Sequence, residues 1–157
     1  MKYLKMNFLV IISIFFSFQS YSQDVRGLSW GMDQSSVKRI ESSNGISFVS
    51  NNDETMVVGS GLVDGKACML VYLFDYMKKK LYGVQMSFNV PFLGKRQDRV
   101  DEFKEILSNK YGSYRKEGGF FIWENSRTKI TLIPDGNNGT IGITYESLVK
   151  SNNSRDF

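Results

Sequence analysis

The fold is decided by residues 82–112, which read YGVQMSFNVPFLGKRQDRVDEFKEILSNKYG. Residues 82–90 alternate strictly between apolar side chains and small or polar ones. The apolar side carries Tyr82, Val84, Met86, Phe88 and Val90. The other side carries Gly83, Gln85, Ser87 and Asn89. Strict alternation predicts a strand with one buried face and one solvent-exposed face.

A helix is expected after Pro91 and Gly94, which interrupt the strand pattern. Its apolar stripe consists of Val100, Phe103, Ile106, Leu107 and Tyr111. Lys110 in the last turn and Gly112 directly after it are typical of a helix end. This stretch therefore supplies one sheet face and one helix stripe that covers it.

The rest of the chain repeats these two patterns. Asp33 is expected to cap a helix of roughly Gln34–Ser43. Strands are expected near residues 46–49, 55–63, 66–76, 120–124, 129–133 and 140–146. Because both faces of 66–76 are apolar, we expect this strand to be central and covered on both sides.

This order of elements predicts an α+β domain. We expect an antiparallel meander sheet of about six to seven strands, with two helices packed on one face. The two halves of the chain have the layout of a tandem α-β-β-β repeat, although no repeat of individual residues is visible.

The first 22 residues have the pattern of an export signal. Lys2 and Lys5 precede an apolar run from Phe8 to Phe18, and small residues precede Gln23. The run is shorter than the roughly 20 residues that a membrane-spanning helix needs. We therefore expect a cleaved signal and an exported protein, periplasmic or secreted, whose single domain is residues 23–157 and whose tail frays from about residue 151. The alternative is a retained N-terminal anchor; after cleavage no stable membrane span is expected.

Composition restricts the chemistry. Without Lys2 and Lys5, 18 basic and 16 acidic residues leave a net charge of +2, which does not indicate nucleic-acid binding. Histidine is absent, which removes the commonest general base and a common metal ligand. Cys68 is the only cysteine and lies in an apolar strand, which favours a buried structural thiol over a nucleophile. We therefore expect no catalytic residues, no metal and no cofactor.

Lys95, Arg96 and Arg99 stand at the start of the second predicted helix, where cations are unfavourable. A break in a local rule can mark a function, here the binding of an anion by side chains and free amides. The alternative is that Asp98 and the acids after it simply neutralise the cluster.

Trp30 and Trp123 are candidates for stacking on sugar rings, with core packing as the alternative. Asp75, Glu124 and Glu146 lie at or near strand ends. Two of them in one cleft would allow glycoside hydrolysis, whereas solubilising strand ends explain each of them singly.

Residues 27–32, Gly-Leu-Ser-Trp-Gly-Met, resemble the opening of small exported bacterial proteins of unassigned function. These share a G-x-x-W-G entry into a first helix, a Tyr-Gly end of a second helix, as at Tyr111-Gly112, and a late tryptophan, as at Trp123. The layout is also similar to β-lactamase-inhibitor-protein-like tandem helix-plus-sheet domains. That resemblance implies binding of other proteins or a role in envelope assembly, although that family often carries disulfides that this chain cannot form.

We therefore expect a non-enzymatic exported protein that binds a protein or cell-envelope component through its exposed sheet face or a hairpin edge. The alternatives are a glycan-binding module that uses exposed aromatics and a hydrolase that works with carboxylates alone.

Overall fold

The computed structural model describes residues 24–50, 53–90, 95–135 and 139–149. The expected signal (1–22) and frayed tail (from 151) lie outside these residues. The helices are α1 (Gln34–Ser43) and α2 (Arg96–Tyr111). The strands are β1 (Ser47–Phe48), β2 (Met56–Val63), β3 (Lys66–Phe74), β4 (Leu81–Asn89), β5 (Arg115–Glu117), β6 (Phe120–Glu124), β7 (Thr128–Ile133) and β8 (Thr140–Ser147). The domain is therefore α+β, as expected.

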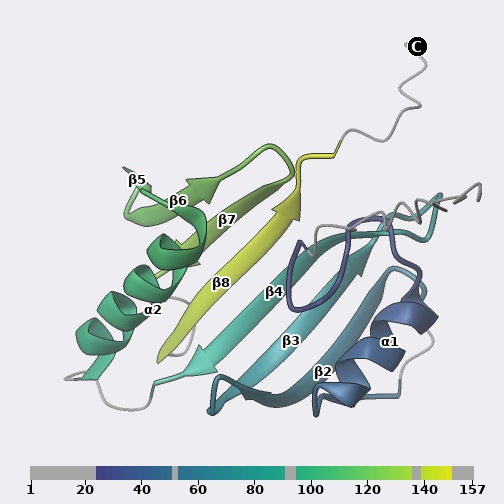
Figure 1. Ribbon diagram of the computed structural model, residues 1–157. Coiled ribbons are helices and arrows are strands. Elements are labelled where there is room, and N and C mark those ends of the chain that lie inside the picture. The colour runs from purple at the N-terminus through teal and green to yellow at the C-terminus, as the bar shows by residue number, and fades with distance from the viewer. Residues whose placement is uncertain (1–23, 51–52, 91–94, 136–138, 150–157) are drawn as a thin grey trace, which may run out of the picture.

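The strands form one antiparallel sheet in the order β1-β2-β3-β4-β8-β7-β6-β5. Each half of the chain is a helix followed by four strands, and the halves meet where β4 pairs with β8 (Figure 1). The sheet is thus two meanders joined at the centre. The strand beyond the expected six to seven is β5, whose three residues are all exposed, so it carries no alternation to reveal it.

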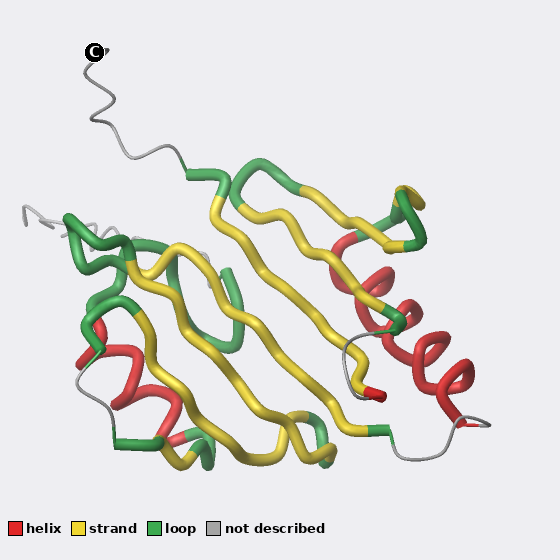
Figure 2. Tube along the Cα trace, turned by 180° about the vertical axis from the view of Figure 1, so that it is seen from behind, coloured by secondary structure: helices red, strands yellow, loops and turns green. Residues whose placement is uncertain are grey.

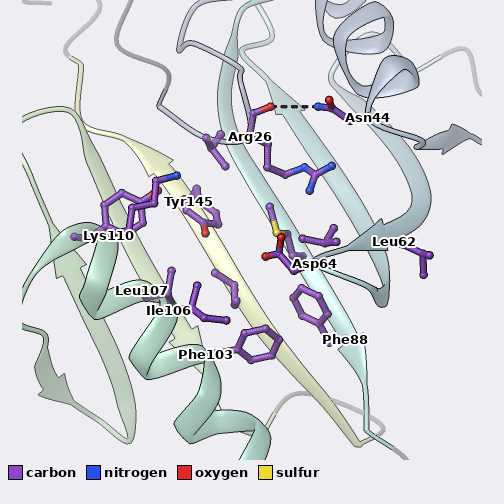
Figure 3. Close-up of a pocket in the computed structure, with 15 residues that line it drawn as sticks. Arg26, Asn44, Leu62, Asp64, Phe88, Phe103, Ile106, Leu107, Lys110 and Tyr145 are labelled. Carbon is purple, nitrogen blue, oxygen red and sulfur yellow. Dashed lines mark hydrogen bonds between the residues drawn. The ribbon is translucent and has the colours of Figure 1, made fainter.

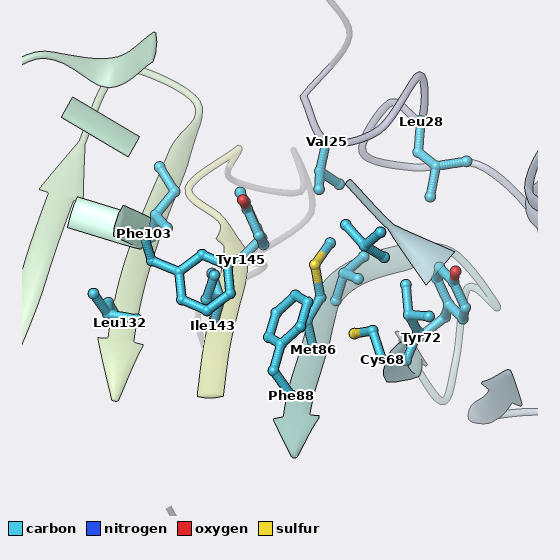
Figure 4. Packing of buried hydrophobic residues seen from close by; sticks show 14 of the residues in the cluster. Val25, Leu28, Cys68, Tyr72, Met86, Phe88, Phe103, Leu132, Ile143 and Tyr145 are labelled. Carbon is cyan, nitrogen blue, oxygen red and sulfur yellow. The ribbon is translucent and has the colours of Figure 1, made fainter. Parts of the chain in front are cut away.

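Both helices lie on the same face of the sheet, and the opposite face is bare in the view from behind (Figures 1 and 2). α1 lies beside β2 and α2 beside β6 and β7. Between the helices, Phe103 of α2 and Val25 belong to the same buried cluster as Met86 and Phe88 of β4 (Figure 4). The core is a single layer between the sheet and the helix side.

The alternation of β4 is confirmed from Val84 to Val90 but not at Tyr82. Tyr82 is 47% exposed, whereas its neighbour Leu81 is buried. The register shifts between Leu73 and Phe74, so that Leu81 pairs with Phe74. This irregularity puts Leu81, rather than Tyr82, at the end of the buried row.

The prediction that the third strand is covered on both faces is wrong for the described residues. Its helix-side residues Cys68, Leu70, Tyr72 and Phe74 are buried. On the other face Ala67 is exposed and Met69 is 50% exposed. β3 is central in the sheet, yet only one of its faces is packed.

The predicted bounds of α1 and its cap are confirmed. The Ser36 amide donates a 2.8 Å hydrogen bond to Oδ1 of Asp33, and the Ser35 hydroxyl donates one of 2.7 Å. These bonds lower the pKa of Asp33 from 3.8 to about 2. Because the folded-state pKa is depressed, the carboxylate stabilises the protein above about pH 4, and this contribution is lost as the pH falls towards about 2.

We predict that Asp33→Ala lowers the melting temperature at about pH 7, and that most of this difference disappears between about pH 4 and 2. Thermal unfolding followed by circular dichroism across this range measures it. Asp33→Asn is the matched control, because an amide oxygen caps a helix at every pH. A difference between wild type and Asp33→Ala that persists undiminished at pH 2 contradicts the prediction.

Candidate functional site

Residues 24–32, here called the lead-in, cross the helix side of the sheet between the two helices (Figure 1). A tight turn at Arg26 and Gly27 begins it, with φ of 52° and 83°. The amide of Gly31 donates to the carbonyl of Leu81 at 2.9 Å, and the Leu81 amide donates to Met32 at 2.8 Å. The lead-in is therefore fixed to β4.

Two ion pairs tie the lead-in to both halves of the chain. Arg26 donates from Nε and Nη2 to the Glu41 carboxylate of α1, at 2.9 Å each. Arg127, in the β6–β7 turn, donates to Asp24 at 2.7 and 2.9 Å. Glu41 is 0% exposed, so Arg26 is needed to compensate its buried negative charge.

Sequence reasoning missed these four residues. Glu41 stands four positions after Val37 and thus on the buried stripe of α1. A carboxylate on a buried stripe requires a cationic partner, and that signal was available. Which cation supplies the partner depends on the turn at Arg26, which residue spacing does not reveal.

The predicted cation cluster does not form one site. Arg96 pairs with Asp135 of the β7–β8 connection, and its guanidinium lies 3.2 Å from where a Cβ on Gly139 would stand. Arg99 pairs with Glu102 at 2.7 Å, one turn along α2. Lys95 is exposed. Two of the three cations are therefore already neutralised, and Arg96 fastens α2 to the β7–β8 connection.

The predicted tryptophans do not form a sugar-stacking platform together. Trp123 is fully buried in the core, and its Nε1 lies 3.3 Å from the Ser108 hydroxyl. No face of its ring is open to a sugar, which agrees with the core-packing alternative. Trp30 is partly buried and donates from Nε1 to Thr128 at 2.9 Å. It lies where the lead-in meets β7.

The thiol of Cys68 is buried, and the strand-end carboxylates are held by hydrogen bonds or ion pairs. Burial raises the pKa of the Cys68 thiol to about 11, so it stays protonated. Asp75 accepts bonds from two turn amides, Met77 and Lys78. Glu124 pairs with Arg115 at 3.0 Å, and Glu146 with Lys129 at 3.6 Å.

The first candidate surface is the helix-free face of the sheet, here called the open face (Figure 2). Its β2–β3 half is apolar apart from Ser60, which pairs with Met69; the exposed or half-exposed apolar residues are Met56, Val58, Leu62, Ala67, Met69, Val71 and Leu73. Val58 pairs with Val71, and Leu62 with Ala67, across the two strands. The strip that follows on β4 is polar, with Gln85, Ser87 and Asn89, as predicted for that face. An apolar area thus lies beside a row of hydrogen-bonding side chains.

The second candidate surface is a groove on the helix side, here called the interhelix groove (Figure 3). It has a volume of about 480 Å³ and runs over β4 and β8 between α2 and the β2–β3 turn. The sequence pointed to one of its residues indirectly. Ile106 belongs to the predicted stripe of α2 but is 39% exposed, because it lies at the mouth of the groove rather than on the sheet.

No family model, curated protein or solved structure matches this chain. Among the described residues, neither helix combines the length and hydropathy of a membrane span. Function is therefore argued from the two surfaces themselves.

We predict that Arg26→Ala lowers the free energy of unfolding by about 3 kcal/mol, because it leaves the Glu41 charge buried without a partner. Urea denaturation at neutral pH measures the change. The double variant Arg26→Met/Glu41→Met should recover most of the loss, since it removes both charges.

The control is Arg99→Ala, which breaks the exposed pair with Glu102 and should cost less than about 1 kcal/mol. Equal losses in the free energy of unfolding for Arg26→Ala and Arg99→Ala would show that the buried pair stabilises the fold no more than an exposed pair does.

Proposed function

We propose that this is an exported, non-enzymatic protein that binds another protein through the apolar half of its open face. The observation that carries the proposal is that β3 is packed on only one of its two apolar faces. Its sequence is apolar on both faces, while the described elements pack on only one. Strands that read as apolar on both sides are normally covered on both sides. A partner protein supplies the second cover.

The size and chemistry of the open face support a protein partner. Its β2–β3 half is contiguous in register over Met69, Val71 and their neighbours. Contiguous exposed apolar surface of this kind marks interaction sites, and methionine adapts its shape to a partner. The adjoining side chains of Gln85 and Ser87 supply hydrogen bonds that fix orientation. This arrangement is that of an interface with an apolar centre and a polar rim.

The alternatives have less support. Glycan binding through both tryptophans fails because Trp123 is buried. Hydrolysis requires two available carboxyls in a cleft, whereas Glu124 and Glu146 each pair with a cation. The layout is similar to β-lactamase-inhibitor-protein-like tandem helix-plus-sheet domains, and the protein binding that this resemblance implies agrees with the proposal.

The test places a photo-crosslinking residue at position 69 of the protein in its native envelope. It then compares how much of the partner protein is recovered with wild type and with Met69→Asp. A specific partner protein should crosslink at 69, and Met69→Asp should weaken its binding by about tenfold or more, because the new charge would be desolvated. Met77→Asp, the same change on the exposed β3–β4 turn, is the control and should bind normally.

Recovery that is equal for wild type and Met69→Asp overturns the proposal. So does the absence of a crosslinked protein at position 69.

A further inference from the structure

The interhelix groove has an apolar floor and apolar walls. Met86 and Phe88 of β4 and Ile143 of β8 form the floor. Phe103 and Leu107 of α2 line one side. The mouth lies between Ile106 on α2 and Asp64 in the β2–β3 turn (Figure 3). Such a groove accepts an elongated apolar group.

One end of the groove is polar. Lys110, Tyr111 and Tyr145 gather there, while Phe103 and Phe88 lie at the opposite end (Figure 3). The Lys110 ammonium is 5.1 Å from the centre of the Tyr111 ring, and the Tyr111 ring centre is 6.4 Å from that of Tyr145. The three side chains therefore form one cluster.

Both phenols in this cluster lack a protein partner. Tyr145 is 8% exposed, and no described residue forms a hydrogen bond with its hydroxyl. The Tyr111 hydroxyl is buried and is also unpartnered among the described residues. Burial raises the pKa of Tyr145 well above its ordinary value, so the phenol is a hydrogen-bond donor at neutral pH. A buried hydroxyl left without a partner, as at Tyr111, is costly, and the Tyr145 phenol beside it supplies a second donor for a ligand oxygen.

The two cations that line the groove differ in whether an acidic side chain already pairs with them. Arg26 is held by Glu41 at 2.9 Å, so its charge is already compensated. Lys110 has no ion pair among the described residues, and it stands beside the two phenols. Asp64, in the β2–β3 turn, is the acid on the opposite wall. An anionic oxygen at the polar end therefore meets one ammonium and two phenol donors, opposed by a single carboxylate.

We propose that the interhelix groove binds a single-chain carboxylate amphiphile, of the fatty-acid class. Its chain lies over Met86 and Ile143 and ends against the Phe88–Phe103 pair, whose ring centres are 4.7 Å apart. Its carboxylate accepts hydrogen bonds from Tyr111 and Tyr145 and faces the Lys110 ammonium. The groove is on the helix side and the protein-binding surface is on the open face, so the two proposals stand or fall separately.

The experiment is isothermal titration of the exported chain, residues 23–157, with dodecanoate below its micellar concentration. We expect saturable binding of one molecule. Tyr145→Phe should weaken binding about tenfold or more, which is the effect of one lost hydrogen bond to a charged group. Lys110→Gln should weaken the binding of dodecanoate but not that of its methyl ester, because the ester carries no charge.

Two further variants test the geometry. Ile106→Trp fills the mouth and should reduce binding at least tenfold, whereas Met77→Trp, on the exposed β3–β4 turn, should not change it. Asp64→Asn should tighten dodecanoate binding about twofold or more, because it removes the opposing charge. Asparagine tolerates the positive φ of this position, so the turn is kept.

The proposal is overturned if dodecanoate does not bind, or if Ile106→Trp binds it as wild type does while circular dichroism shows both to be folded. Equal affinity for dodecanoate and its methyl ester, unchanged in Lys110→Gln, overturns the assignment of a carboxylate ligand.

Discussion

The buried carboxylate of Glu41 is the constraint on which the rest of this structure depends. It stands on the packed stripe of α1 with no access to water, so the fold must bring a cation to it. The turn at Arg26 and Gly27 does so and holds the lead-in over the middle of the sheet. The lead-in then buries Val25 and Leu28, and Asp24 reaches Arg127 in the other half. One local charge requirement thus adds a second connection between the two helix-plus-strand units, which also meet where β4 pairs with β8.

The same arrangement creates the interhelix groove. The helices lie over opposite wings of the sheet, and the lead-in covers only part of the space between them. The remaining part leaves Phe88 and Ile143 beneath a groove, and Tyr111 and Tyr145 at its end. On the other side of the sheet neither described helix covers the strands, and the apolar half of the open face includes Leu62 and Met69. The molecule therefore offers two surfaces of different chemistry, one enclosed and suited to a small ligand, and one broad and suited to a protein.

Much of the fold could be predicted from local patterns. The cap at Asp33, the bounds of α1 and the alternation from Val84 to Val90 follow from nearest-neighbour sterics and hydrogen bonding, which residue order encodes directly. The site was less predictable. Lys95, Arg96 and Arg99 are neighbours in sequence, but Arg96 turns to Asp135 and Arg99 to Glu102. Trp123 reads equally well as a binding or a core residue, because alternation within β6 does not say which face the helix covers.

The sequence by itself determined the element types, the α+β class and the absence of histidine and paired cysteine chemistry, because these depend on composition and on spacing along the chain. Only the tertiary structure decided that β3 is bare on one face, that Glu41 meets Arg26, and that two phenols share a groove with Lys110. These facts depend on how the β4–β8 pairing and the lead-in place distant segments together. The physical reason is that long-range pairing selects among many arrangements that are locally equivalent, so residue order alone leaves them undecided.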